Sequence, residues 1–241
     1  MRERRTSLFA LGWALLSTAA LAAAAHAGDP SPAAVPAPKP AEDPRVRVIV
    51  EKLQHLYDSL EAFKVVFKQT DELRTLGKSK TAEGVFYFRK PGKMRWDYER
   101  PDKERKLIVV DSRYIWVYLQ GDERVYRSPV DAALESQTLI GFLGGLGKLD
   151  ESFDVRMAGE AKPGGNWRLH LVPKGNADAP EFDLDVRATN HEIARIHFDD
   201  PFGNTTTLDF GPIQSQAAIP EDLFKFIVPE GVKIQDASAG Y

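Results

Sequence analysis

The fold is decided by residues 81–118, which read TAEGVFYFRKPGKMRWDYERPDKERKLIVVDSRYIWVY. Phe86 and Phe88 fall on one side of a two-residue repeat in this stretch. Met94 and Trp96 also share one side, after a Pro-Gly turn. Such alternation is typical of β-strands that bury one face. The stretch therefore predicts neighbouring strands that together offer one large apolar surface.

The β pattern continues on both sides of these two strands. Short apolar runs separated by polar turns predict consecutive antiparallel hairpins rather than a strand-helix alternation. The further strands are expected at 63–70, 106–110, 114–119, 123–128, 153–159, 167–172, 181–188, 193–199, 205–210 and 232–234. With helices at its start and middle, the chain predicts a mainly β (α+β) fold of about eleven strands, a single curved sheet or incomplete antiparallel β-barrel with helices on its concave side.

Two segments interrupt the strands with helical spacing. Residues 45–63 place apolar side chains along one helical stripe, and Asp43 and Pro44 suit the start of a helix. Residues 131–149 show a second apolar stripe broken by four glycines. Each interior glycine costs about 1 kcal/mol relative to alanine, so we expect this second segment to be a marginal, hinged helix. A phosphate-binding loop is disfavoured there, because no strand leads into a Lys-Ser or Lys-Thr pair.

The chain starts like an exported protein. Three arginines precede an apolar run at 8–25, and Ala25-His26-Ala27 is a small-x-small cleavage site, so residues 1–27 are predicted to be a signal peptide. A retained membrane anchor is the weaker alternative, because the run is short for a bilayer span. Residues 28–44 contain six prolines and predict a disordered linker. Residues 45–241 are then expected to form one exported domain.

Composition excludes several classes of function. The sequence has no cysteine, which excludes disulfides, thiolate metal sites, a cysteine nucleophile and lipid attachment at an N-terminal cysteine. The net charge is −3; removing residues 1–27, which carry +2, leaves −5, so bulk charge does not favour nucleic-acid binding. The histidines lack the spacing of a zinc site, and no serine has a nucleophile-elbow setting. We expect no enzyme, no cofactor and no metal.

The aromatic faces leave two interpretations open. They either fill an ordinary barrel core or form a cradle for an apolar ligand. Lys90 lies in phase with the phenylalanines, and a buried lysine without a partner is costly. We therefore expect Lys90 at a rim, where its ammonium reaches carbonyls or a carboxylate.

An ordered set of motifs identifies the chain as similar to a known family. The set begins with a strand that contains Phe63, Phe67 and Gln69, and continues with Gly84-x-Phe86-x-Phe88-x-Lys90-Pro91, Met94-Arg95-Trp96, and Val109-x-Asp111 followed by Trp116-x-Tyr118. In this order the motifs resemble those of the LolA family of periplasmic lipoprotein carriers. The resemblance implies an incomplete barrel closed by an α-helical lid over a hydrophobic cavity for acyl chains. The residues expected at the cavity, the last three of them in the lid, are Phe63, Phe67, Phe86, Phe88, Met94, Trp96, Trp116, Leu139, Phe142 and Leu143.

The same resemblance implies a latch and a set of partners. The family often has an arginine before the proline that holds the lid; here Lys90 stands in that place, with Arg95 or Arg89 as substitutes and Arg89 on the opposite face. A monomer would take lipoproteins from an inner-membrane ABC exporter of LolCDE type and release them to an outer-membrane acceptor of LolB type. The alternative is a lipoprotein-binding sensor of RseB type.

Overall fold

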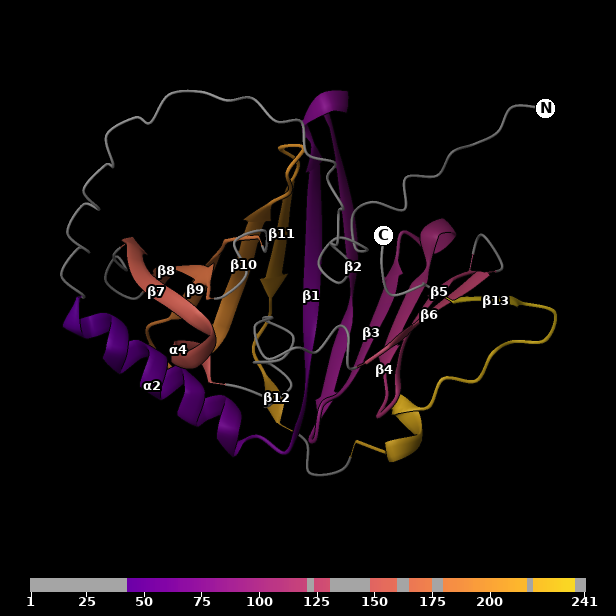
Figure 1. The fold of residues 1–241 in the computed structure, drawn as a ribbon, viewed down its shortest axis with the longest axis horizontal. Helices are drawn as coiled ribbons and strands as arrows, with labels where there is room; N and C mark the ends of the chain where they lie inside the picture. Colours follow the sequence, from indigo (N-terminus) through magenta and orange to yellow (C-terminus); the bar gives the residue numbers. More distant parts are fainter. Residues whose placement is uncertain are drawn as a thin grey trace, which may run out of the picture.

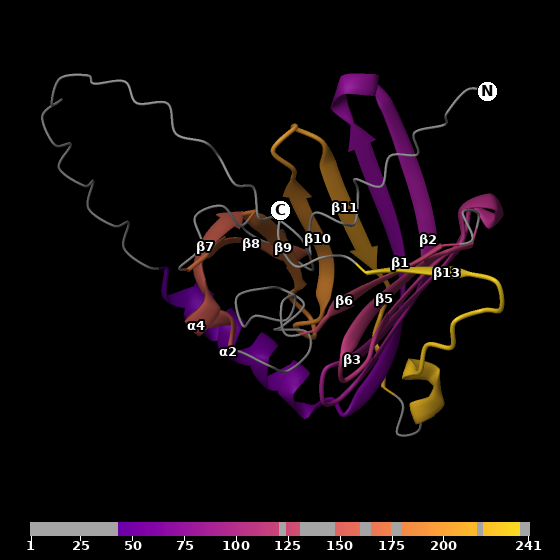
Figure 2. The same ribbon diagram turned by 45° about the vertical axis from the view of Figure 1, so that its right-hand side comes forward.

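The computed structural model describes residues 43–120, 124–130, 148–159, 165–174, 180–215 and 219–236. Within them one sheet runs in the order β13-β6-β5-β4-β3-β2-β1-β11-β10-β9-β8-β7, and β12 pairs with β1. The sheet is strongly curved and open, and its two halves face each other across a concave side (Figures 1 and 2). The predicted incomplete barrel is confirmed, with thirteen strands in place of about eleven.

The first half of the sheet contains the predicted aromatic stretch, which lies in β2 to β5. Its bounds are β1 Ala62–Leu73, β2 Lys78–Arg89, β3 Lys93–Arg100, β4 Lys106–Val110, β5 Tyr114–Leu119 and β6 Arg124–Pro129. The second half consists of β7 Phe153–Gly159, β8 Asn166–Pro173, β9 Phe182–Arg187, β10 Ile193–Asp199 and β11 Thr205–Phe210, with the short β12 at Gln214–Ser215. Antiparallel pairing joins β1 to β11, so the first strand stands in the middle of the sheet.

Helix α2 spans Pro44–Ser59 and begins as the sequence predicts. Asp43 caps it by accepting a hydrogen bond from the backbone N–H of Arg45, and Pro44 occupies its first turn, where no donor is needed. The helix ends four residues before the predicted position, because the chain turns extended at Leu60 and the alternation of β1 begins at once. Its buried stripe joins the inward side chains of both halves of the sheet in one core, through Val46, Ile49, Val50, Leu53 and Tyr57.

A glycine in β2 permits a close approach to β3. The pairing of β2 with β3 shifts between Glu83 and Gly84. A Cβ atom at Gly84 would lie 2.0 Å from the carbonyl oxygen of Asp97, a distance that no side chain tolerates. Only glycine therefore permits β2 and β3 to approach so closely at this point.

The C-terminal segment packs partly on the outer face of the first half of the sheet and partly along the edge of that half. It contains the 3-10 helix η4, Glu221–Phe224, and strand β13, Lys233–Asp236. Strand β13 pairs in parallel with β6, which departs from the purely antiparallel prediction. Two shorter elements complete this half, η1 at Arg74–Leu76 and η2 at Asp102–Glu104, and α4 at Leu149–Ser152 precedes β7. None of the helices described is long and apolar enough to cross a membrane.

Candidate functional site

Strand register arranges the inward side chains of β1 to β5 in transverse rows. The first row runs Phe63, Phe88, Met94, Val110, Ile115, and the second runs Val65, Phe86, Trp96, Ile108, Val117. The third row runs Phe67, Gly84, Tyr98, Lys106, Leu119. We call them the first, second and third rows. The first two rows are wholly apolar, whereas polar groups enter at the third.

Aromatic side chains of these rows pack directly on one another. The ring centroids of Phe86 and Trp96 lie 4.2 Å apart, and those of Phe63 and Phe88 lie 5.2 Å apart. Phe63, Phe86 and Phe88 are almost fully buried, but Trp96 is only half-buried. The predicted residues Phe63, Phe67, Phe86, Phe88, Met94 and Trp96 therefore lie together on the concave side.

The described core leaves little empty space. A gap of about 20 Å³, measured for the centre of a water-sized sphere, lies between α2, β1, β2 and β10–β11. That volume admits about one water molecule. Its walls are Tyr57, Phe63, Val65, Phe86, Ile193, Ile196, Phe210 and Ile213. The gap itself is too small for an acyl chain, so a chain would enter only if these walls separate.

Trp116 lies on the opposite face of the sheet from the other predicted cavity residues. It pairs with Val109 and Arg127, whereas its neighbours Ile115 and Val117 belong to the inward rows. Its ring stacks on Phe226 of the C-terminal segment with centroids 5.3 Å apart, and its Nε1 donates a hydrogen bond to Asp111. Trp116 thus anchors the outer covering of the sheet and does not reach the concave side.

Lys90 lies at the rim, as expected from its cost of burial. Its Nζ donates a hydrogen bond to the carbonyl oxygen of Asp58 at 2.5 Å, next to the C-terminal end of α2. A cation is favourable at this end of a helix, where backbone carbonyls are without helical partners. Lys90 therefore ties the β2–β3 turn to α2. The predicted lid residues Leu139, Phe142 and Leu143 lie outside the described residues.

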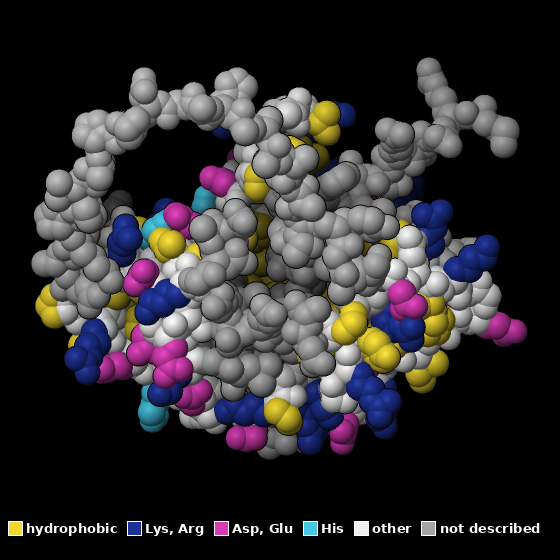
Figure 3. Space-filling model, in the orientation of Figure 1, with side chains coloured by type: hydrophobic (Ala, Val, Ile, Leu, Met, Phe, Trp, Pro, Cys, Tyr) yellow, Lys and Arg dark blue, Asp and Glu magenta, His cyan; other side chains and the backbone are white. Residues whose placement is uncertain are grey.

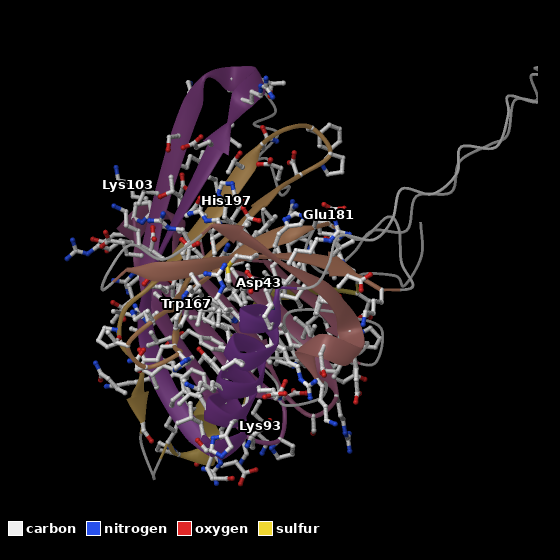
Figure 4. The ribbon with its side chains drawn as sticks, turned by 90° about the vertical axis from the view of Figure 1, so that its left-hand side faces the viewer. Asp43, Lys93, Lys103, Trp167, Glu181 and His197 are labelled. Atoms are coloured by element: carbon white, nitrogen blue, oxygen red, sulfur yellow. The ribbon has the colours of Figure 1, made fainter. Side chains whose placement is uncertain are left out.

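The two arginines considered as substitutes for Lys90 both face the C-terminal segment. Arg89 donates to the carbonyl oxygen of Ile219, and Arg95 donates to Asp97 and to the carbonyl oxygen of Leu223. Lys93 of the same face pairs with Glu221 and is labelled in Figure 4. These contacts fasten η4 to the outer face, on the side of the sheet away from the concave rows.

A hydrogen-bonded chain of polar groups begins where the apolar rows end. The hydroxyl of Tyr98 donates to Gln69 Oε1 at 2.8 Å, and Gln69 Nε2 donates to both carboxylate oxygens of Asp71 at 2.9 Å. Thr206 donates to Asp71 from the neighbouring β11. Burial raises the pKa of Tyr98 far above its ordinary value. Tyr98 therefore stays a neutral donor in this chain.

Lys106 stands beside this chain, and sequence reasoning missed it. Its Nζ lies 3.9 Å from the centroid of the Tyr98 ring. Burial lowers the pKa of Lys106 to about 8, and the nearby carboxylate of Asp71 opposes that shift. The sequence presents Lys106 only as the first residue of a short strand. Its inward direction follows from its register opposite Tyr98, which no local pattern contains.

Polar clusters elsewhere in the described residues have ordinary structural roles. His170 lies between Asp183 and Glu181 on the second half of the sheet, at 2.8 and 2.9 Å. Burial opposes its protonation, but hydrogen bonds to the two carboxylates outweigh it and raise the pKa of His170. No group of three potential metal ligands gathers in the described part of the chain. Charged side chains of both signs are mixed over the face shown in Figure 3.

Known proteins share this sequence pattern. Residues 58–227 match the family described as "Outer membrane lipoprotein carrier protein LolA". An "Outer-membrane lipoprotein carrier protein" of Cupriavidus pinatubonensis is 30% identical over 167 residues, which cover 69% of this chain and 74% of the relative. A protein with the same name from Chromobacterium violaceum is 30% identical over 185 residues, covering 77% of this chain and 86% of the relative.

A solved structure shares the fold. An uncharacterized conserved protein from Thermus thermophilus aligns with a TM-score of 0.51 at 15% identity, covering 80% of this chain and 99% of that protein. At this identity the likeness supports the open curved sheet alone. The family match extends from the end of α2 to the C-terminal segment and so includes the three rows and their covering. The chain belongs to the LolA family.

Proposed function

We propose that the protein is a lipoprotein carrier that holds acyl chains against the first and second rows of its concave side. The observation that carries this proposal is the continuous apolar surface of the two rows, on which Trp96 is half-buried and beyond which polar groups begin at the third row. The family is named for lipoprotein carriage, which is a non-catalytic role. An apolar strip with a polar end suits a ligand that is itself apolar with a polar end.

The energetics require that binding and release be nearly balanced. A sixteen-carbon chain at about 0.8 kcal/mol per buried methylene would gain roughly 12 kcal/mol, which is already a nanomolar affinity. In the described conformation the rows pack against α2, with the Tyr57 and Phe63 ring centroids 5.9 Å apart. A chain that enters must separate these contacts, and they re-form when it leaves. Closure of the empty core therefore returns part of the binding energy and makes discharge possible.

The route of the cargo follows from the family. The mature protein works in the periplasm after cleavage near Ala27, takes lipoproteins from an inner-membrane ABC exporter of LolCDE type, and gives them to an acceptor of LolB type. On the family's pattern the lid over the cavity would contain Leu139, Phe142 and Leu143. Lys90 acts as its latch by fixing the end of α2 on which the closed state depends. Because Arg95 faces η4, its part in the latch is indirect.

A release assay tests the carrier function. Spheroplasts that synthesise lipoproteins labelled with radioactive palmitate are incubated with the purified mature protein, and the labelled proteins in the supernatant are separated by size. A carrier releases many different lipoproteins in soluble complexes. Release of none contradicts the proposal, and capture of a single envelope protein instead supports a sensor of RseB type.

A further inference from the structure

The concave side changes from apolar to polar along a single direction. Below the third row, β4 runs from Lys106 to Val110 and β3 from Tyr98 to Met94, each with only apolar residues directed inward. Four residues of strand correspond to about 13 Å of apolar depth. Above the third row lie Gln69 and Asp71 with Thr206. Lys106 and Tyr98 thus stand at the boundary between the two regions.

Lys106 is short of hydrogen-bond acceptors at this boundary. Among the described residues, no oxygen accepts a hydrogen bond from its Nζ, and its close contact is with the face of Tyr98. The nearby carboxylate of Asp71 is already engaged by Gln69 and Thr206. The attraction between a cation and an aromatic face replaces only part of the hydration that the half-buried ammonium of Lys106 gives up. An acceptor oxygen brought by a ligand would supply what the protein leaves out.

We propose that Lys106, supported by Tyr98, binds the carbonyl or carboxylate head of the acyl ligand, while its chain lies along the second and first rows. The proposal rests on the carrier function and assigns the orientation of the cargo within it. The shared chemistry is an acyl oxygen, which is an ester carbonyl in an acylated cysteine and a carboxylate in a free fatty acid. The ammonium donates to this oxygen, and the rings of Tyr98 and Trp96 flank the first carbons of the chain.

The alternative is that Lys106 only packs on Tyr98 and has no ligand. The substitution Lys106→Met distinguishes ligand binding from packing alone, because methionine keeps the unbranched stem and removes the charge. The matched control is Lys103→Met on the exposed η2, which removes the same charge from solvent (Figure 4). Both variants are checked for an unchanged melting temperature before binding is compared.

The experiment measures dissociation constants of palmitic acid, methyl palmitate and hexadecanol by displacement of a fluorescent fatty acid. We expect Lys106→Met to weaken the binding of palmitic acid at least about 10-fold, because a charge-assisted hydrogen bond contributes about 1.5–3 kcal/mol. The affinity for hexadecanol should change less than twofold. If the variant also binds methyl palmitate more weakly, the group that Lys106 binds is an acyl carbonyl. If only the binding of palmitic acid is weakened, the group is a carboxylate. Unchanged acid binding, or an equal loss for all three ligands, overturns the proposal.

A second measurement uses the unaltered protein. Titration of Lys106, followed by the NMR shift of its ε-carbon, should show a raised pKa when palmitic acid is bound, because a carboxylate favours the charged ammonium. Hexadecanol should leave the pKa where it is. An unchanged pKa with bound acid contradicts the assignment. If the unaltered protein binds none of the three ligands, it is the carrier function that fails.

Discussion

Trp96 is the inward residue whose replacement tests the acyl surface most sharply. It lies in the middle of the second row, with ring centroids 4.2 Å from Phe86 and 5.1 Å from Phe67. Because it is only half-buried, a ligand can cover the rest of its ring. Trp96→Glu places a carboxylate on the acyl surface, and Trp96→Leu keeps the position apolar.

The expected loss of affinity follows from the area involved. A tryptophan side chain buries up to about 250 Å² in full, and at most about a third of Trp96 is exposed, so a ligand contacts up to roughly 80 Å² of it. At about 25 cal/mol per Å² this contact contributes up to about 2 kcal/mol, or on the order of 30-fold in the dissociation constant. Trp96→Glu should weaken fatty-acid binding by about this factor or more, and Trp96→Leu should weaken it by only a part of this factor.

The assay is displacement of a fluorescent fatty acid, with a matched control on the outer face. Val66 is 51% exposed on the opposite side of β1, so Val66→Glu introduces the same charge away from the rows. We expect Val66→Glu to bind like the unaltered protein. Far-ultraviolet circular dichroism and melting curves establish that all variants are folded. If folded Trp96→Glu binds the fatty acid as tightly as Val66→Glu, the acyl surface is elsewhere.

Two further predictions concern Lys90 and His170. Lys90→Leu removes the hydrogen bond to Asp58 and should lower the free energy of unfolding by roughly 1–2 kcal/mol, which denaturant unfolding measures. The variant should still load lipoproteins but discharge them more slowly, which a transfer assay measures. Unchanged discharge contradicts the role of Lys90 as a latch. His170 has a raised pKa in the folded protein, so its contribution to stability is complete below its unfolded pKa of about 6.5 and is lost as pH rises through the folded value. His170→Gln should therefore lower the melting temperature more at about pH 6 than at about pH 8. An equal decrease at both pH values would refute the stabilising role of protonated His170.

The sequence was most informative where its pattern is local. Phe86, Phe88, Met94 and Trp96 alternate within single strands, and a two-residue repeat determines which side chains share a face. Lys90 was expected to reach a carbonyl oxygen, and Asp58 provides it. Each of these inferences needed only neighbouring residues and the cost of leaving a charge unpaired.

The sequence was least informative where one strand must be placed against another. Trp116 was assigned to the cavity, but the phase of a repeat cannot be carried across the turn between β4 and β5; the observed register sets Val109 opposite Trp116 and directs both outward. The same limit concealed Lys106, whose environment comes from Tyr98 on β3. The parallel pairing of β13 with β6 joins segments separated by about a hundred residues, which no turn signal encodes.

Photocrosslinking tests the central claim, that acyl chains lie on the concave rows, most directly. A benzoylphenylalanine is placed at position 96 in one protein and at position 116 in another, and each is irradiated after loading with lipoprotein labelled with radioactive palmitate. The two positions lie on opposite faces of the same sheet. The account predicts labelled adducts from position 96 and none above background from position 116. Equal labelling at both positions, or labelling at position 116 alone, would contradict it.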